Sequence, residues 1–122
     1  MSKSNIFDPA MLTQFTGTLN WYAYGMGARI MITDGTKYVA DTAGAYWLLD
    51  EISLTQLSVT AVRVEEFQVW ELKVKDDNSA ELICEDGNGK RVYTKTIPYT
   101  DFPACGIRFY FLDNVLLLPS EY

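Results

Sequence analysis

The 122-residue chain contains no histidine. Histidine is the commonest general base of enzymes and the commonest protein ligand of transition metals, so its absence removes most catalytic and metal-binding arrangements. The chain has only two cysteines, Cys84 and Cys105, whose separation of 21 residues matches no zinc-binding or redox pattern. We therefore expect a protein that is not an enzyme and that needs no metal or cofactor.

Long hydrophobic runs are also missing. The aliphatic stretch at 115–118 has four residues, whereas a membrane-spanning helix needs about 20. The first residues, Met1 to Asn5, do not lead into the apolar core of a secretory signal. We expect a cytoplasmic protein that does not enter the membrane and keeps both thiols reduced.

Positive charge is scarce, with 10 Lys and Arg residues against 16 Asp and Glu residues and a net charge of −6. The basic residues are scattered, and only Lys90 and Arg91 are adjacent in the chain. Direct binding to nucleic acid is therefore not expected, since it requires clustered cations against the phosphates. Two interpretations of the acidity stay open: either it serves only solubility, or it forms a surface that competes with nucleic acid for a basic partner.

The many acidic residues match no familiar ligand pattern. The segment from Asp86 to Lys90 superficially resembles a calcium loop, but its fifth position is Lys90 and its twelfth is Ile97, where oxygen ligands are required. Adjacent acids on a strand point to opposite faces, which disfavours a catalytic pair. If the chain has a catalytic site, the first acid to examine is Asp50, beside Trp47, because the apolar helix that carries it is expected to bury it partly.

The hydrophobic content of 48% is that of an ordinary globular domain, and the length fits one domain over residues 1–122. Apolar residues recur at i, i+3, i+4 and i+7 from Ala45 to Ile52, which predicts the principal helix, capped by Asp41 or Thr42. Asp8-Pro9 predicts a short N-terminal helix over 10–15.

Alternation of period two dominates the rest of the chain and predicts strands. The expected strands cover 19–24, 29–33, 57–64, 67–75, 80–85, 90–99, 107–112 and 115–118. The expected turns include Gly25-Met26-Gly27, Asp34-Gly35, 76–79, 86–89 and Asp113-Asn114. The predicted fold is α+β: an antiparallel β-sheet meander with one principal helix packed on it and a short N-terminal helix.

The aromatic residues suggest either a core of large rings or an exposed patch that binds a partner protein. The candidate partner-binding residues are Tyr46 and Trp47 of the predicted helix and the acidic turn residues Asp76, Asp77, Glu85 and Asp86. An exposed edge strand could also form a homodimer. The alternative function is small-ligand binding, in a pocket between helix and sheet lined by Trp21, Trp47 and Trp70.

Five segments together resemble a known family. They are Phe15-Thr16-Gly17-Thr18-Leu19, Thr33 to Tyr38, Ala43 to Asp50, Glu66 to Trp70 and Leu117 to Tyr122. Over nearly its whole length the chain resembles domain of unknown function 6876, a family of short bacterial and phage proteins. The resemblance implies no activity, cofactor or site residue.

What the resemblance implies is a mobile-element context, in which a small acidic protein acts by binding a host protein or nucleoprotein complex. The hypothesis is an inhibitor of a host nucleic-acid-handling machine, such as an RNA-guided nuclease. Its acidic turns and aromatic side chains would face Lys/Arg channels that normally hold nucleic acid.

Overall fold

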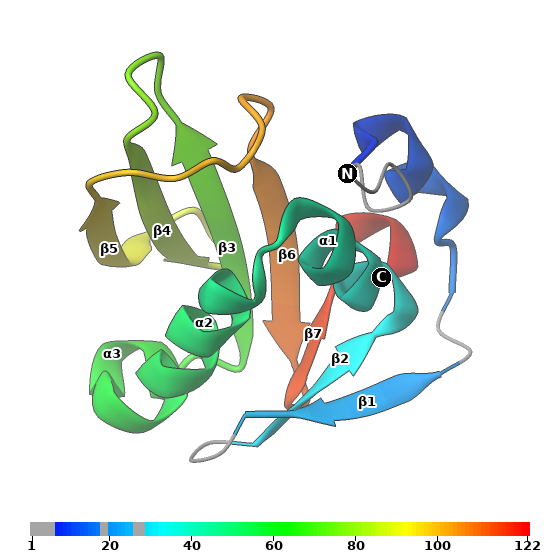
Figure 1. The fold of residues 1–122 in the computed structure, drawn as a ribbon. Coiled ribbons are helices and arrows are strands. Elements are labelled where there is room, and N and C mark those ends of the chain that lie inside the picture. Colours follow the sequence, from blue (N-terminus) through cyan, green and yellow to red (C-terminus); the bar gives the residue numbers. More distant parts are fainter. Residues whose placement is uncertain (1–6, 18–19, 26–28) are drawn as a thin grey trace.

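The computed structural model describes residues 7–17, 20–25 and 29–122. The strands are β1 (Trp21–Tyr24), β2 (Ile30–Thr33), β3 (Phe67–Val74), β4 (Ala80–Asp86), β5 (Arg91–Ile97), β6 (Ile107–Leu112) and β7 (Val115–Leu117). They form one sheet in the order β1-β2-β7-β6-β3-β4-β5, with α-helices packed on one face (Figure 1). All strand pairs are antiparallel except β2–β7, which is parallel. The α+β class and the mainly antiparallel sheet are therefore confirmed.

The connectivity is not a simple meander. The segment β3-β4-β5 follows chain order, but β6 returns to the other side of β3, and β7 then pairs with both β6 and β2. Alternation along a strand shows which side chains share a face, but it does not show which neighbour the strand pairs with. The expected order was wrong for this reason.

The helical part comprises more than one main helix. Its elements are α1 (Asp34–Ala43), α2 (Tyr46–Ser58) and α3 (Thr60–Arg63), with 3₁₀ helices η1 (Pro9–Gln14) and η2 (Pro119–Glu121). The predicted principal helix corresponds to α2, and the predicted N-terminal helix to η1, capped by the Asp8 carboxylate at 3.0 Å from the Ala10 amide nitrogen. Asp41 and Thr42 lie inside α1, so the expectation that one of them caps α2 was wrong.

The turn expected at Asp34-Gly35 was wrong, because these residues begin α1. Thr33 caps this helix by accepting a hydrogen bond from the Thr36 amide, and Gly44 ends it with a positive φ of 61°. These are ordinary start and stop signals of a helix. They were obscured because Asp-Gly is also a typical turn pair.

The strand expected at 57–64 was also wrong, since this segment completes α2 and forms α3. A short apolar run fits a strand and a buried helix equally well. In the helical arrangement, Gln68 of β3 contacts the end of this segment: its side-chain amide donates to the carbonyl oxygens of Val62 (2.9 Å) and Glu65 (3.2 Å).

The other strands agree with the alternation to within a few residues. Their hairpins contain positive φ angles at Asn78, Gly89, Asp113 and Asn114. The start of the predicted 19–24 strand and most of the Gly25-Met26-Gly27 bend lie outside the described residues.

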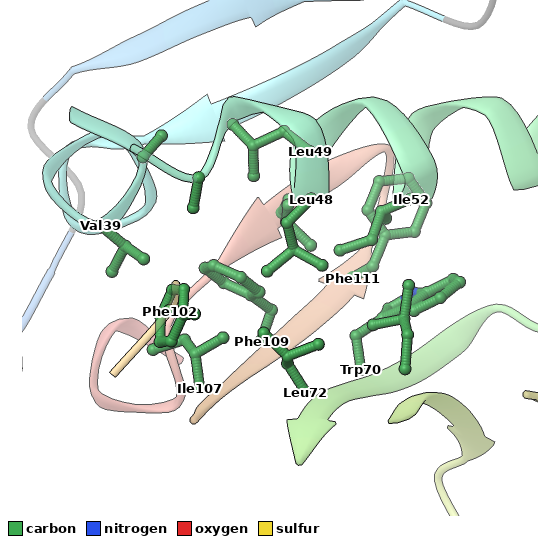
Figure 2. Close-up of a cluster of buried hydrophobic side chains, with 14 of the residues drawn as sticks. Val39, Leu48, Leu49, Ile52, Trp70, Leu72, Phe102, Ile107, Phe109 and Phe111 are labelled. Carbon is green, nitrogen blue, oxygen red and sulfur yellow. The ribbon is translucent and has the colours of Figure 1, made fainter. Parts of the chain in front are cut away.

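The main core lies between α1, α2 and one face of the sheet. Figure 2 shows Leu48 and Ile52 of α2 facing Trp70, Leu72 and Phe109 of β3 and β6. All five side chains are at most 1% exposed, and each buried leucine or isoleucine stabilises the fold by roughly 1.5–3 kcal/mol. Solid packing thus fills the region where the ligand-binding alternative required a pocket.

Candidate functional site

The acidic turn residues proposed from the sequence do not lie together. Asp76 and Asp77 are in the β3–β4 hairpin, whereas Glu85 and Asp86 are at the other end of β4 (Figure 1). The first five residues of β4 lie between the hairpin and Glu85, which corresponds to roughly 17 Å at 3.3 Å per residue.

Two of these acids hold their own turns. The Asp77 carboxylate accepts hydrogen bonds from the Ser79 hydroxyl (2.6 Å) and amide (3.0 Å), which lower the pKa of Asp77. Asp86 accepts from the amides of Asn88 and Lys90, both at 2.9 Å. Hydrogen bonds of this kind, from backbone amides to a nearby carboxylate, are typical of turns. Asp77 and Asp86 therefore stabilise the turns in which they lie.

Tyr46, by contrast, belongs to a compact polar cluster that the sequence did not indicate. We call this cluster the Tyr–Asp surface. Its members are Tyr22 and Tyr24 of β1, Asp34, Lys37 and Asp41 of α1, and Tyr46 and Asp50 of α2. Trp47, the other candidate on α2, is half-buried and packs against the core.

One part of the Tyr–Asp surface centres on Asp34, in the first turn of α1. The Tyr22 hydroxyl donates to Asp34 Oδ1 at 2.9 Å, and the Asn20 amide nitrogen lies 3.3 Å from Asp34 Oδ2. The Lys37 ammonium lies 5.7 Å from the centre of the Tyr22 ring, within the range of a cation–π interaction. These contacts tie β1 to the start of α1.

The other part joins β1, α1 and α2 through two tyrosines. The Tyr24 hydroxyl donates to Asp50 Oδ1 at 2.5 Å, and the Tyr46 hydroxyl donates to Asp41, which also pairs with Lys37 at 2.9 Å. The Tyr24 and Tyr46 rings are stacked, with centroids 5.8 Å apart. Asp50 is exposed, not partly buried as expected from the sequence.

The hydrogen bonds of the Tyr–Asp surface move its pKa values away from neutrality. The hydrogen bond to Asp34 raises the pKa of Tyr22, and the hydrogen bond to Asp41 raises the pKa of Tyr46. The pKa of Tyr24 is raised first by partial burial and then by its hydrogen bond to Asp50. The pKa of Asp41 is lowered by the Tyr46 hydroxyl and then by Lys37. These groups therefore each keep one protonation state near pH 7, which suits a fixed recognition surface better than proton transfer.

A cavity of about 610 Å³ adjoins this surface, between η1 and α1. The lining from α1 consists of Asp34, Lys37, Tyr38 and Asp41. The opposite wall includes Phe15, which directly follows η1. Its volume is in the range of small-molecule sites. Within the described ranges, no group of three or more acidic or thiol side chains is placed to hold a metal ion. No helix formed by those residues is long and apolar enough to cross a membrane.

Sequence reasoning missed this surface because its members come from three separate elements. The one local signal is the alternation in β1, which places Tyr22 and Tyr24 on the same face. Their aspartate partners lie 12 and 26 residues away in the chain, so only the tertiary structure brings them together.

Comparison with known proteins gives a family but no function. No curated protein and no solved structure matches the chain significantly. The model of one family of unknown function, DUF6876, matches residues 9–122. This match covers nearly the whole chain and agrees with the resemblance seen in its sequence motifs, so the chain belongs to the DUF6876 family.

Proposed function

We propose that this chain is a non-enzymatic protein-binding domain that recognises a basic surface of its partner through the Tyr–Asp surface. The observation that supports this most directly is that three aspartates, Asp34, Asp41 and Asp50, each accept a tyrosine hydroxyl within one surface. Lys37 is the single cation of this cluster and already pairs with Asp41. Three acids and one base give the cluster a net charge of −2.

The chemistry of these groups favours arginine or lysine as the contact. A carboxylate that accepts one tyrosine hydroxyl retains further lone pairs for a guanidinium or ammonium group. Tyrosine rings offer flat faces for arginine stacking, and tyrosine is enriched among residues that dominate binding energy. Because the tyrosines are held by their hydroxyl groups, little side-chain entropy is lost when a partner binds.

In its most specific form, the proposed partner is a host protein or nucleoprotein complex that handles nucleic acid. Such a complex carries channels of Lys and Arg that an acidic surface can occupy in place of phosphates. The net charge of −6 supports this version by steering the chain toward basic surfaces. A mobile-element inhibitor of a host defence complex would act in this way.

The cavity beside the surface supports a second candidate, the binding of a small ligand. Its lining combines Asp34 and Asp41 with the rings of Phe15 and Tyr38, a combination suited to a small amine with an apolar body. This candidate places the ligand between η1 and α1, not between the principal helix and the sheet.

The test is a nuclear magnetic resonance titration of the full chain with an arginine-rich peptide. We expect chemical-shift changes centred on Tyr22, Tyr24 and Tyr46, weakened by salt. The double variant Asp41→Asn/Asp50→Asn should lose them. Asp76→Asn/Asp77→Asn is the matched control, because it removes the same charge in a distant hairpin, and it should behave like the wild type.

The outcomes separate the alternatives. Equal loss in both double variants would mean that only net charge matters and would contradict the proposed surface. Changes around Phe15 and Tyr38 with small amines, but none with the peptide, would favour the small-ligand candidate. If the peptide binds as expected, capture from nuclease-treated host lysate by the wild type, but not by Asp41→Asn/Asp50→Asn, would identify the partner.

A further inference from the structure

The sheet face opposite the α-helices is unusually apolar, and we call it the outer face. Strand alternation assigns to the main core only one set of side chains from each strand, such as Trp70 and Leu72 of β3. The opposite set combines charged side chains on β3, β4 and β6 with apolar side chains on six strands: Trp21, Met31, Phe67, Val69, Ile83, Tyr110, Leu112, Val115 and Leu117. Ile83, Val115 and Leu117 are buried although none of them belongs to the main core cluster. The outer face therefore has its own layer of apolar packing.

Aromatic rings stand at the surface of this layer. Phe67, Tyr110 and Tyr122 form a triad with ring centroids 5.1 to 5.6 Å apart. Tyr122 remains 72% exposed and Trp21 57% exposed. Both line a groove of about 210 Å³, whose other lining residues are the apolar Leu112, Val115 and Leu117 and the acidic Asp113 and Glu121. Exposed aromatic side chains beside an apolar groove are typical of interaction sites in soluble proteins.

Most charged side chains on the outer face lie beside a side chain of opposite charge. Glu71 pairs with Arg108 at 3.2 Å. The strand register also places Lys73 opposite Glu81 and Glu85 opposite Arg91. These three acids and three bases cancel, and the groove beside Trp21 adds two acids, Asp113 and the buried Glu121. The outer face thus carries −2 of the chain's net charge of −6. A second copy of an acidic chain is therefore repelled less by this face, where most charges are paired, than by the rest of the first copy.

The outer face also has the size that a dimer needs. Seven strands about 4.8 Å apart and about six residues long span roughly 30 Å by 20 Å. This is of the order of the roughly 800 Å² per partner that stable interfaces bury. Two sheets stack in this way in β-sandwiches, with interdigitating side chains between them.

We propose that the occupant of the outer face is a second copy of this chain, related by a two-fold axis, with Trp21 and Tyr122 of each copy buried against the other. In such an isologous dimer each copy contributes the same patch. The Tyr–Asp surfaces lie on the helical side, so the dimer presents two of them. This inference rests on the apolar and charge pattern of the outer face and does not depend on the proposed function.

The experiment is analytical ultracentrifugation of the full chain over a range of concentrations. We expect a species of twice the 13.8 kDa chain mass, with an affinity that changes little with salt because most charges of the interface are paired. The variant Trp21→Glu/Val69→Lys keeps the net charge and should weaken dimerisation about tenfold or more. Trp21→Ser is a milder second variant in case the double variant does not fold.

The matched control is Leu54→Glu/Leu57→Lys on α2, which changes two leucines that are 55% and 52% exposed. It introduces the same charges on the helical side and should leave the dimer intact. A wild-type chain that is monomeric at all concentrations would overturn the proposal and leave the outer face to a different protein. Equal weakening by the control, or a dimer unaffected by both outer-face variants, would also overturn it.

Discussion

The carboxylate of Glu121 accepts a hydrogen bond at 3.0 Å from the backbone amide of Gly35, 86 residues earlier in the chain. The same carboxylate accepts from the Thr33 hydroxyl (2.6 Å) and the Leu118 amide (2.9 Å). A buried acidic side chain is thus placed at the N-terminus of α1, where free backbone amides favour an acceptor group. Two of the segments that carry the family resemblance, Thr33 to Tyr38 and Leu117 to Tyr122, therefore meet in space.

The first prediction concerns Gly35→Ala. In a helix, alanine is normally about 1 kcal/mol more favourable than glycine. Here a Cβ would lie 2.6 to 2.8 Å from Leu118 Cδ1 and the Glu121 carboxylate, and that carboxylate is fixed by its three donors. We expect a net loss of about 1–3 kcal/mol in the free energy of unfolding, measured with urea. Gly17→Ala, where no atom lies within 4 Å of the added Cβ, should not be destabilised. A stabilised Gly35→Ala variant would contradict the contact.

The second prediction concerns Gln68, a fully buried amide between β3 and the α2–α3 corner. Its Oε1 accepts from Trp70 Nε1 at 2.9 Å, and its Nε2 donates to the Val62 carbonyl at 2.9 Å. Gln68→Leu should lower the free energy of unfolding by about 2–4 kcal/mol, because these buried groups lose their partner. The exposed Gln14→Leu variant should change stability by less than about 0.5 kcal/mol. Similar values for both variants would show that the amide network contributes little.

The third prediction concerns the pH dependence of the Tyr–Asp surface. Its tyrosines have pKa values raised above 10 in the folded chain. A raised pKa means that the fold prefers the protonated form, so this stabilisation is present below pH 10 and is lost as the pH rises through the folded values. The tyrosinate absorbance of the folded chain should therefore show tyrosines that ionise late, and one fewer in Tyr24→Phe. Ionisation of all eight tyrosines near pH 10 in the native state would contradict the hydrogen bonds.

The fourth prediction distinguishes the two thiols. Burial, followed by the charges of Glu65 and Glu85, raises the pKa of Cys84 to about 12, whereas Cys105 is exposed. Since the thiolate is the reactive form, a disulfide reagent should titrate one thiol in the native chain and two in denaturant. Cys105→Ser should remove the native reaction. Rapid modification of Cys84 in this variant under native conditions would show that β4 opens easily.

The local pattern of the sequence determined much of this fold. Alternation placed β3 correctly, with Trp70 and Leu72 inward and Glu71 and Lys73 outward, because side chains on a strand alternate between its faces. The spacing from Ala45 to Ile52 located α2 for the equivalent reason in a helix. The composition also supplied the acidic charge on which the proposed partner rests.

Other features depended on contacts between distant residues. The helix α1 begins at a pair that is equally suited to a turn, and Glu121 from the end of the chain stabilises its first turn. The aromatic residues had to be sorted by packing, since Trp70 is buried in the core while Trp21 remains exposed. Nothing in their local sequence distinguishes them.

The candidate site was decided by the tertiary structure alone. Tyr46 was singled out from the sequence, but its partners on α1 and β1 were not, and the acidic turns at Asp76 and Asp86 proved to lie at opposite ends of β4. Local periodicity determines the face on which a side chain lies, because it follows from backbone geometry. Which faces meet depends on strand order and helix packing, and these are set by the burial of apolar surface over the whole chain.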